Sequence, residues 1–109
     1  MNADVKAKWV AALRSGEYEQ GRTRLCDLDC RMCCLGVLTD LYRKEFGGEW
    51  VPVEDGKLYL DEGVFLPREV AVWAGLRFNP YIGTQSASVL NDELNKSFSE
   101  IADLIEARL

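Results

Sequence analysis

Four cysteines fall within nine residues of this chain, at positions 26, 30, 33 and 34, and the state of their thiols constrains the fold more than any other feature. Cys26, Cys30 and Cys33 have the Cys-x-x-x-Cys-x-x-Cys spacing that brings three thiolates to an iron–sulfur cluster in radical enzymes. Such enzymes enclose the radical in a large barrel, which a chain of 109 residues cannot form. A four-thiolate zinc site would use two separated pairs of cysteines, not one run that ends in Cys33-Cys34.

The same four thiols share one face if their segment is helical, and a buried cysteine behaves as a small hydrophobic residue. On that face adjacent Cys33 and Cys34 would diverge by about 100°, so a disulfide between them would be strained. We therefore predict reduced thiols that pack in the core, with no cofactor and no bound metal. A metal cluster and nucleophilic or redox chemistry stay open as alternatives.

The chain contains no histidine. This excludes Ser-His-Asp and Cys-His catalysis, histidine-ligated metals and the usual general base near neutral pH. A thiolate nucleophile would also need an activating base. The sequence therefore predicts a binding protein with no catalytic residue, and not an enzyme.

The hydrophobic periodicity predicts a compact α+β fold, one single domain over residues 1–109, with about four helices and a small antiparallel β-hairpin or sheet. The expected helices span residues 3–14 and 29–46, a short segment from Pro67 to Gly75, and a last segment opened by the capping box Ser97-Phe98-Ser99-Glu100. Residues 17–25 are expected to form a loop with a short strand. Residues 77–96 are less regular, with turn signals at Asn79-Pro80 and Gly83.

Two short β-type runs, Trp50–Val53 and Lys57–Leu60, flank Asp55-Gly56, which is a favourable hairpin turn. Pro52 cannot donate to a strand ladder, so the first run is expected to be an edge strand. We expect Trp50, beside this edge, to be the most exposed tryptophan. An exposed edge can pair with another sheet or with a second copy, so a homo-oligomer is one expected assembly.

No apolar run approaches the ~20 residues that a membrane span needs. The first residues, Met1–Lys6, also lack the apolar stretch of a secretory signal. The sequence therefore predicts a cytoplasmic protein with no membrane partner.

Charge is distributed unevenly along the chain. Residues 1–44 carry eight basic and six acidic residues, a net charge of +2, whereas residues 45–109 carry five basic and twelve acidic residues, a net charge of −7. The total of −5 argues against a nucleic-acid duplex as partner, because duplex-binding proteins normally present a basic surface. The basic half can hold a small anion, and an ordinary solvated surface is the alternative.

Four blocks of sequence, residues 8–21, 33–42, 66–76 and 90–106, resemble a family of small uncharacterised proteins of tailed bacteriophages and bacterial prophages. The most specific are CCLGVLTDLY at residues 33–42 and the Leu-Asn-Asp and Ser-Phe-Ser-Glu-Ile-Ala-Asp-Leu-Ile-Glu runs of the last block. Cys26 and Cys30 do not belong to this pattern. The resemblance implies no particular activity. It implies a setting, that of an accessory protein in the cytoplasm of an infected or lysogenic host bacterium.

Arg22 and Arg24 precede the second expected helix. If the N-terminus of that helix is open, its free N–H groups and the two guanidinium groups would bind a phosphate, and a guanidinium also stacks on bases. The alternative is that both arginines pair with nearby carboxylates, those of Glu19, Asp27 or Asp29.

Asn91 and Asp92 follow an apolar pair and precede the last helix. Such a pair can bind the Watson–Crick edge or the ribose of a nucleotide, although it more often forms an Asx-turn. With Trp50 as an aromatic platform, these residues complete the predicted ligand-binding set: Arg22, Arg24, Trp50, Asn91 and Asp92.

Two functions fit these observations. The first is an accessory binding protein that antagonises host antiviral defence by sequestering a nucleotide immune signal, for which no catalytic group is required. The alternative is an acidic protein–protein inhibitor of a host defence or nucleic-acid-handling protein, in which the carboxylates of residues 45–69 and 92–106 occupy a basic groove.

Overall fold

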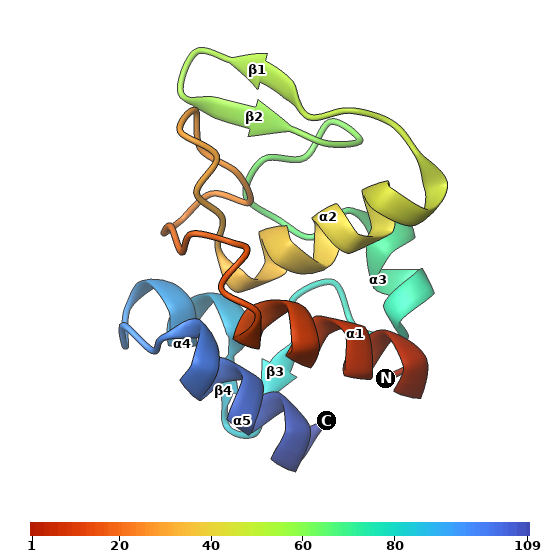
Figure 1. The fold of residues 1–109 in the computed structure, drawn as a ribbon, viewed down its shortest axis with the longest axis vertical. Coiled ribbons are helices and arrows are strands. Elements are labelled where there is room, and N and C mark those ends of the chain that lie inside the picture. Colours follow the sequence, from red (N-terminus) through yellow and green to blue (C-terminus); the bar gives the residue numbers. More distant parts are fainter.

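The structure, a computed structural model that describes residues 1–109, contains five helices and two antiparallel sheets of two strands each (Figure 1). The helices are α1 (Ala3–Arg14), α2 (Cys34–Phe46), α3 (Arg68–Ala74), α4 (Ala87–Asp92) and α5 (Phe98–Arg108). The strands are β1 (Val51–Val53), β2 (Gly56–Leu58), β3 (Tyr81–Ile82) and β4 (Gln85–Ser86). The predicted compact α+β domain is confirmed, and α4 is a helix that the sequence did not predict. No helix is long and apolar enough to cross a membrane.

Helices α1 and α5 lie side by side and bring the two chain termini together (Figure 1). Both helices begin where their caps predict. The Asn2 side chain accepts a hydrogen bond from the N–H of Val5, and Ser97 and Glu100 form a capping box. On the solvent side, Arg14 of α1 forms ion pairs with Asp103 and Glu106 of α5. Local capping signals therefore define the two helices that pack together.

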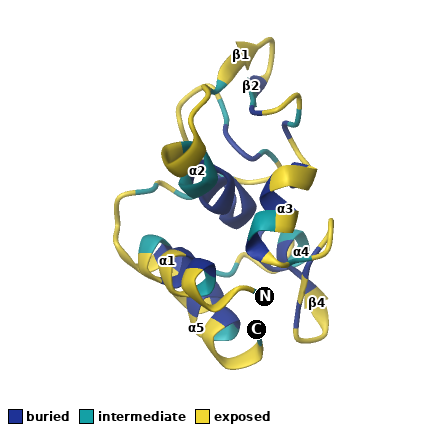
Figure 2. Cartoon of the chain, turned by 90° about the vertical axis from the view of Figure 1, so that its right-hand side faces the viewer, coloured by how far each residue is buried: buried dark blue, intermediate teal, exposed yellow.

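Helix α2 lies at the centre of the fold and packs against α1, α3 and α4. Its first seven residues, Cys34–Asp40, are buried, and Figure 2 shows these turns enclosed by the other elements. At Gly36 the helix touches the backbone of the preceding loop, because a Cβ atom there would lie 1.8 Å from the carbonyl oxygen of Leu25. Trp9 of α1, fully buried, donates from its indole Nε1 to the carbonyl of Cys34 at 2.9 Å.

The expected start of α2 at residue 29 is wrong. Residues 26–33 form a loop, since the Asp27 carboxylate accepts hydrogen bonds from the backbone N–H groups of Asp29 and Arg31, both at 2.9 Å. Cys30 has a φ of +64°, which no α-helix contains. The short strand expected in residues 17–25 is reduced to a single bridge between Gln20 and Met32.

Strands β1 and β2 form the predicted hairpin at one end of the molecule, where most of its surface is exposed (Figures 1 and 2). Val51 pairs with Leu58 and Val53 with Gly56, so the turn residues are Glu54 and Asp55 rather than Asp55-Gly56. All three residues of β1 are exposed, while the N–H of Lys57 in β2 donates to the carbonyl of Cys26 at 2.9 Å. β1 is therefore the open edge of this hairpin.

Residues 77–96 are more regular than the sequence predicted. They contain the hairpin β3–β4 and helix α4, whose cap Ser86 accepts from the N–H of Val89. These elements span only two to six residues, so none shows a full hydrophobic period. The predicted short helix before them is confirmed as α3, which ends at Gly75 with a left-handed φ of +69°.

Candidate functional site

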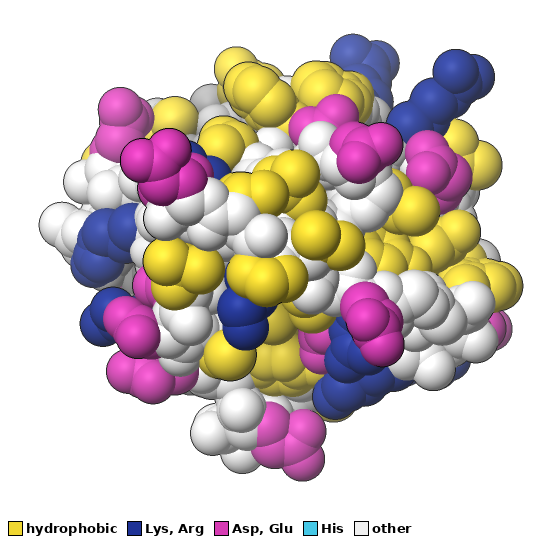
Figure 3. Space-filling model, turned by 90° about the horizontal axis from the view of Figure 1, so that it is seen from above, with side chains coloured by type: hydrophobic (Ala, Val, Ile, Leu, Met, Phe, Trp, Pro, Cys, Tyr) yellow, Lys and Arg dark blue, Asp and Glu magenta, His cyan; other side chains and the backbone are white.

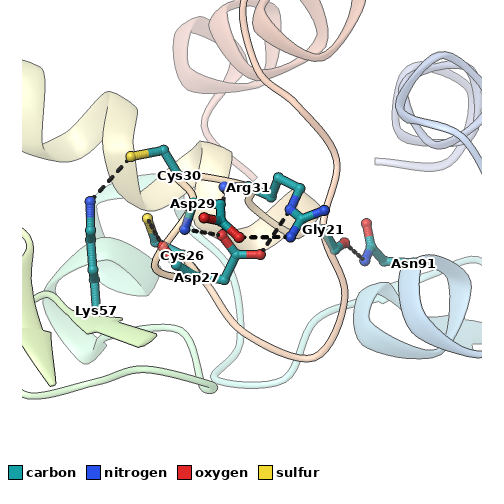
Figure 4. Close-up of polar contacts among 8 residues, drawn as sticks. All are labelled: Gly21, Cys26, Asp27, Asp29, Cys30, Arg31, Lys57 and Asn91. Atoms are coloured by element: carbon teal, nitrogen blue, oxygen red, sulfur yellow. Dashed lines mark hydrogen bonds and ion pairs between the residues drawn. The ribbon is translucent and has the colours of Figure 1, made fainter. Parts of the chain in front are cut away.

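Asn91 joins three segments of the chain and uses its whole hydrogen-bonding capacity to do so. It is fully buried, and its Oδ1 accepts from Nε2 of Gln20 at 2.9 Å and from the N–H of Cys34 at 3.2 Å. Its Nδ2 donates to the carbonyl of Gly21 at 2.9 Å (Figure 4) and to Oδ1 of Asp92 at 2.8 Å. An asparagine amide has two donor hydrogens and two acceptor lone pairs, and all four are occupied. Asn91 therefore holds the fold together and is not free to bind a nucleotide.

The expected phosphate site is not open, because Cys33–Gly36 at the start of α2 are buried. That prediction needed free N–H groups at the start of the second helix, and the N–H of Cys34, the first residue of α2, donates to Asn91. Asp92 is likewise engaged, because its Oδ1 accepts from the N–H of Thr23 at 2.8 Å. The hollow beside it, about 350 Å³, has two carboxylates in its lining, those of Asp92 and Glu93, which would repel a phosphate.

The two candidate arginines lie in separate contacts. Arg22 donates from Nε to Oδ1 of Asn95 at 2.9 Å. Arg24 forms an ion pair with Asp55 in the β1–β2 turn and lies against Gly56, where a Cβ atom would be 2.7 Å from its Cδ. Neither pairs with the carboxylates that the sequence suggested, Glu19, Asp27 and Asp29. Arg24 therefore anchors the hairpin, and Arg22 is bound only through an exposed hydrogen bond.

Trp50, expected to be the most exposed tryptophan, is only partly exposed, as Trp73 is, while Trp9 is buried. Trp50 is half-buried, with its ring centroid 5.7 Å from that of Tyr59, and its Nε1 donates to Oδ1 of Asp40 at 2.9 Å. No surface hollow is lined by Trp50, Arg22, Arg24 or Asn91. The structure therefore does not bring the five predicted residues into one pocket.

Asp40 is a buried carboxylate that the sequence analysis did not single out. Besides Trp50, it accepts from the hydroxyl of Tyr18 and from Nε of Arg43, both at 2.7 Å, and Lys44 Nζ lies 3.8 Å away. Burial raises the pKa of Asp40, but the hydrogen bonds from Arg43, Trp50 and Tyr18 outweigh it and hold the pKa below its ordinary value of 3.8. Asp40 thus joins α2 to the loops on both sides of it.

We expect this carboxylate to contribute to acid unfolding. Because its pKa is lowered on folding, the unfolded chain binds the proton more tightly, so the stabilisation is present above the ordinary pKa of 3.8 and is lost as pH falls through the folded value. Each unit of pKa lowering corresponds to about 1.4 kcal/mol. The free energy of unfolding, measured with denaturant from neutral to acidic pH, should fall less steeply at acidic pH for Asp40→Asn than for the wild type. Glu93→Gln, at an exposed position, should keep the pH dependence of the wild type. The same pH dependence in both variants would contradict the role of Asp40 in acid unfolding.

The four cysteines differ from one another more than the sequence predicted. Cys26, Cys33 and Cys34 are buried, and burial raises their pKa values, to about 11 for Cys26, to about 12 for Cys33 and well above 9.0 for Cys34. Cys30 is exposed at the tip of the loop, with its Sγ 3.1 Å from Nζ of Lys57 (Figure 4). The prediction of core packing is therefore confirmed for three thiols and wrong for Cys30, because the turn around Asp27 replaces the expected helix.

No group of three or more histidine, cysteine or acidic side chains is arranged to hold a metal ion. The spacing of Cys26, Cys30 and Cys33 therefore does not place three thiolates around a common centre.

We expect one fast thiol per chain in native protein. A maleimide or an aromatic disulfide reagent should modify Cys30 at once, because it is exposed, and the other three only after unfolding, since a buried thiol with a raised pKa supplies little thiolate. Mass spectrometry after brief labelling gives the count, and Cys30→Ser should reduce it to none. Rapid labelling of Cys33 or Cys34 in the native protein would show that the core is not packed as described.

The β1–β2 end of the molecule combines exposed apolar and acidic side chains. Val51, Val53 and Leu60 are 55%, 38% and 44% exposed. The acidic residues of this end that have no ion-pair partner are Glu49, Glu54, Asp61 and Glu62. Figure 3 views the molecule from this end and shows hydrophobic side chains across the face, with acidic and basic ones among and around them. We call this surface the hairpin face.

The cations of the hairpin face do not balance its negative charge. Arg24 is already neutralised by Asp55, and Arg31 by Asp27 and Asp29, which leaves Lys57 beside Cys30. Every buried side-chain nitrogen and oxygen in the fold has a hydrogen-bond partner. The hairpin face is therefore the candidate site. Among the sequence-based predictions, the acidic segment at residues 45–69 comes closest to it.

Comparison with known proteins gives a family but no activity. The chain matches, over residues 1–109, the family described as a domain of unknown function, DUF8296. No curated protein and no solved structure matches it.

Proposed function

Since the chain belongs to the DUF8296 family, whose description names no activity, we propose its function from the geometry: it is a binding protein that inhibits a partner protein by docking the hairpin face on a basic surface. The observation that carries this proposal is the set of four carboxylates without ion-pair partners beside the exposed Val51, Val53 and Leu60. Large exposed apolar groups bordered by polar ones are typical of protein-binding surfaces.

The two kinds of side chain have different roles in this docking. The valines and the leucine provide apolar area, whose burial is worth roughly 25 cal/mol per Å² before the costs of association. The unpaired carboxylates attract and orient a basic partner, which increases the association rate and excludes acidic partners. The open edge of β1 adds free backbone groups, although Pro52 limits how far another strand can pair there.

The setting comes from the sequence resemblance to phage and prophage proteins. There, the partner is a host defence or nucleic-acid-handling protein in the bacterial cytoplasm, and the hairpin face occupies the groove in which that partner binds nucleic acid. No catalytic group is needed for such inhibition.

The test compares proteins retained from a bacterial lysate by immobilised wild type and by the variant Glu49→Gln/Glu54→Gln/Asp61→Asn. We expect a basic protein that the wild type retains at low salt and that the triple variant loses. The wild type should release it at high salt, because charges are screened within about 3 Å at 1 M.

The matched control removes three charges elsewhere, in Asp4→Asn/Glu17→Gln/Glu93→Gln, and should retain the same protein. Val51→Ser/Val53→Ser should weaken retention without altering its dependence on salt. Equal retention by the wild type and the hairpin-face triple variant would overturn the proposal.

Sequestration of a nucleotide signal stays a prediction. Arg22 is the one exposed residue of the predicted set, so the nucleotide hypothesis now depends on a phosphate contact at Arg22. Arg22→Glu should then abolish binding in a titration with nucleotides, and no binding by the wild type would exclude it. Arg24 is unsuitable for this test because its reversal would also detach the hairpin from Asp55.

A further inference from the structure

A second apolar surface lies between α3 and the C-terminal end of α2, where the two helices meet at an angle (Figure 1). Three aromatic rings form its floor, with centroid distances of 4.6 Å between Tyr42 and Phe46, 5.5 Å between Tyr42 and Trp73, and 6.1 Å between Phe46 and Trp73. The groove has a volume of about 430 Å³. Its lining consists of Tyr42, Phe46, Arg68, Glu69, Val72 and Trp73.

Two apolar residues of this groove have unusually large exposed fractions. Val72, in the middle of α3, is 72% exposed, the highest fraction among the exposed large hydrophobic residues of the chain, and Phe46 is 58% exposed. Nothing in the fold covers either side chain. Val72 and Phe46, together with the rings of Tyr42 and Trp73, form a surface whose free energy falls when another apolar surface covers it.

The charges of the groove indicate what covers it. Arg68 and Glu69 are neighbours at the start of α3, and neither forms an ion pair or a side-chain hydrogen bond within the chain. A basic partner would be repelled by Arg68, and an acidic partner would be repelled by Glu69. A second copy presents the same two charges in reverse order across a two-fold axis, so each arginine meets a glutamate.

We propose that the α2–α3 groove is the interface of a two-fold homodimer, in which Val72 and Phe46 of the two copies pack together and Arg68 faces Glu69 of the partner subunit. The dimer would leave the hairpin face of each copy free, because β1 and β2 contribute no residue to the groove. This surface differs from the Trp50 edge that the sequence suggested for self-association.

Charge exchange tests the proposal directly. Sedimentation equilibrium should show a dimer for the wild type. Arg68→Glu places glutamates opposite one another and Glu69→Arg places arginines opposite one another. Either change should raise the dimer dissociation constant by about 100-fold or more, because like charges opposed at an interface cost several kcal/mol. The double variant Arg68→Glu/Glu69→Arg restores opposite pairs and should dimerise again.

Two further variants separate association from folding. Val72→Asp should yield a monomer with an unchanged circular dichroism spectrum, because that side chain is exposed within one copy. Arg108→Glu, at an exposed position of α5, should leave the dimer intact. A monomeric wild type, or a double variant that stays as dissociated as the single ones, would overturn the proposal.

Discussion

Asn91→Ala is expected to destabilise the protein by several kcal/mol. The change removes the acceptor of the Cys34 N–H and the donor to the Gly21 carbonyl, and each buried group left without a partner costs about 1–3 kcal/mol. Gln20 loses a partner as well, which loosens the loop that it ties to Phe98. Because a domain of this kind is stable by only about 5–15 kcal/mol, the variant should unfold at a much lower urea concentration.

The control for this prediction is Asn79→Ala. Asn79 is exposed, and its one side-chain contact, with Ser88, is long at 3.5 Å. It should change the free energy of unfolding by no more than about 0.5 kcal/mol. If the two variants unfold at the same urea concentration, Asn91 does not hold the segments together as described.

Gly36→Ala is expected to be equally severe, although alanine is the better helix former. Its Cβ would lie 1.8 Å from the carbonyl oxygen of Leu25 and 2.7 Å from the carbonyl carbon, so α2 or the loop must move. Alanine gains about 1 kcal/mol in helix propensity, whereas such overpacking against backbone costs about 3 kcal/mol or more. The net loss should appear as a lower midpoint in thermal unfolding.

Ser99→Ala is the comparison, because it places alanine on an exposed turn of α5. It should remain within about 0.5 kcal/mol of the wild type. A Gly36→Ala variant as stable as Ser99→Ala would show that α2 and the Leu25 backbone are not in contact.

The sequence predicted those elements whose signals are local. The caps Asn2 and Ser97 define α1 and α5 from their own neighbouring residues, and Pro67 with Gly75 delimits α3 in the same way. The start of α2 was misplaced because the residues before it have helix-compatible side chains. The Asp27 carboxylate accepts hydrogen bonds from two backbone N–H groups, and these bonds turn the chain out of a helical path.

The candidate site could be predicted only in part. The role of Asn91 depends on Gln20, Gly21 and Cys34, which lie 57 to 71 residues away in the chain, so no spacing reveals it. Arg24 likewise finds its carboxylate at Asp55, across the hairpin. Composition did indicate an acidic second half, but it could not show which carboxylates stay unpaired after folding.

One physical distinction separates the residues that looked functional from those proposed to be so. Asn91, Asp92 and Arg24 have polar groups that the fold itself satisfies. The hairpin face and the α2–α3 groove instead keep apolar area and charges that the fold leaves without partners. Binding free energy is available only from the second kind of group.

Native mass spectrometry of protein purified gently from bacterial cells tests this account most directly, because its central claim is that the chain binds macromolecules through exposed surfaces rather than a small molecule in a pocket. We expect only whole multiples of the polypeptide mass, that of the two-fold dimer among them, with no bound small molecule. An additional mass of a few hundred daltons that is lost on unfolding and contains phosphate would contradict it, and would favour sequestration of a nucleotide.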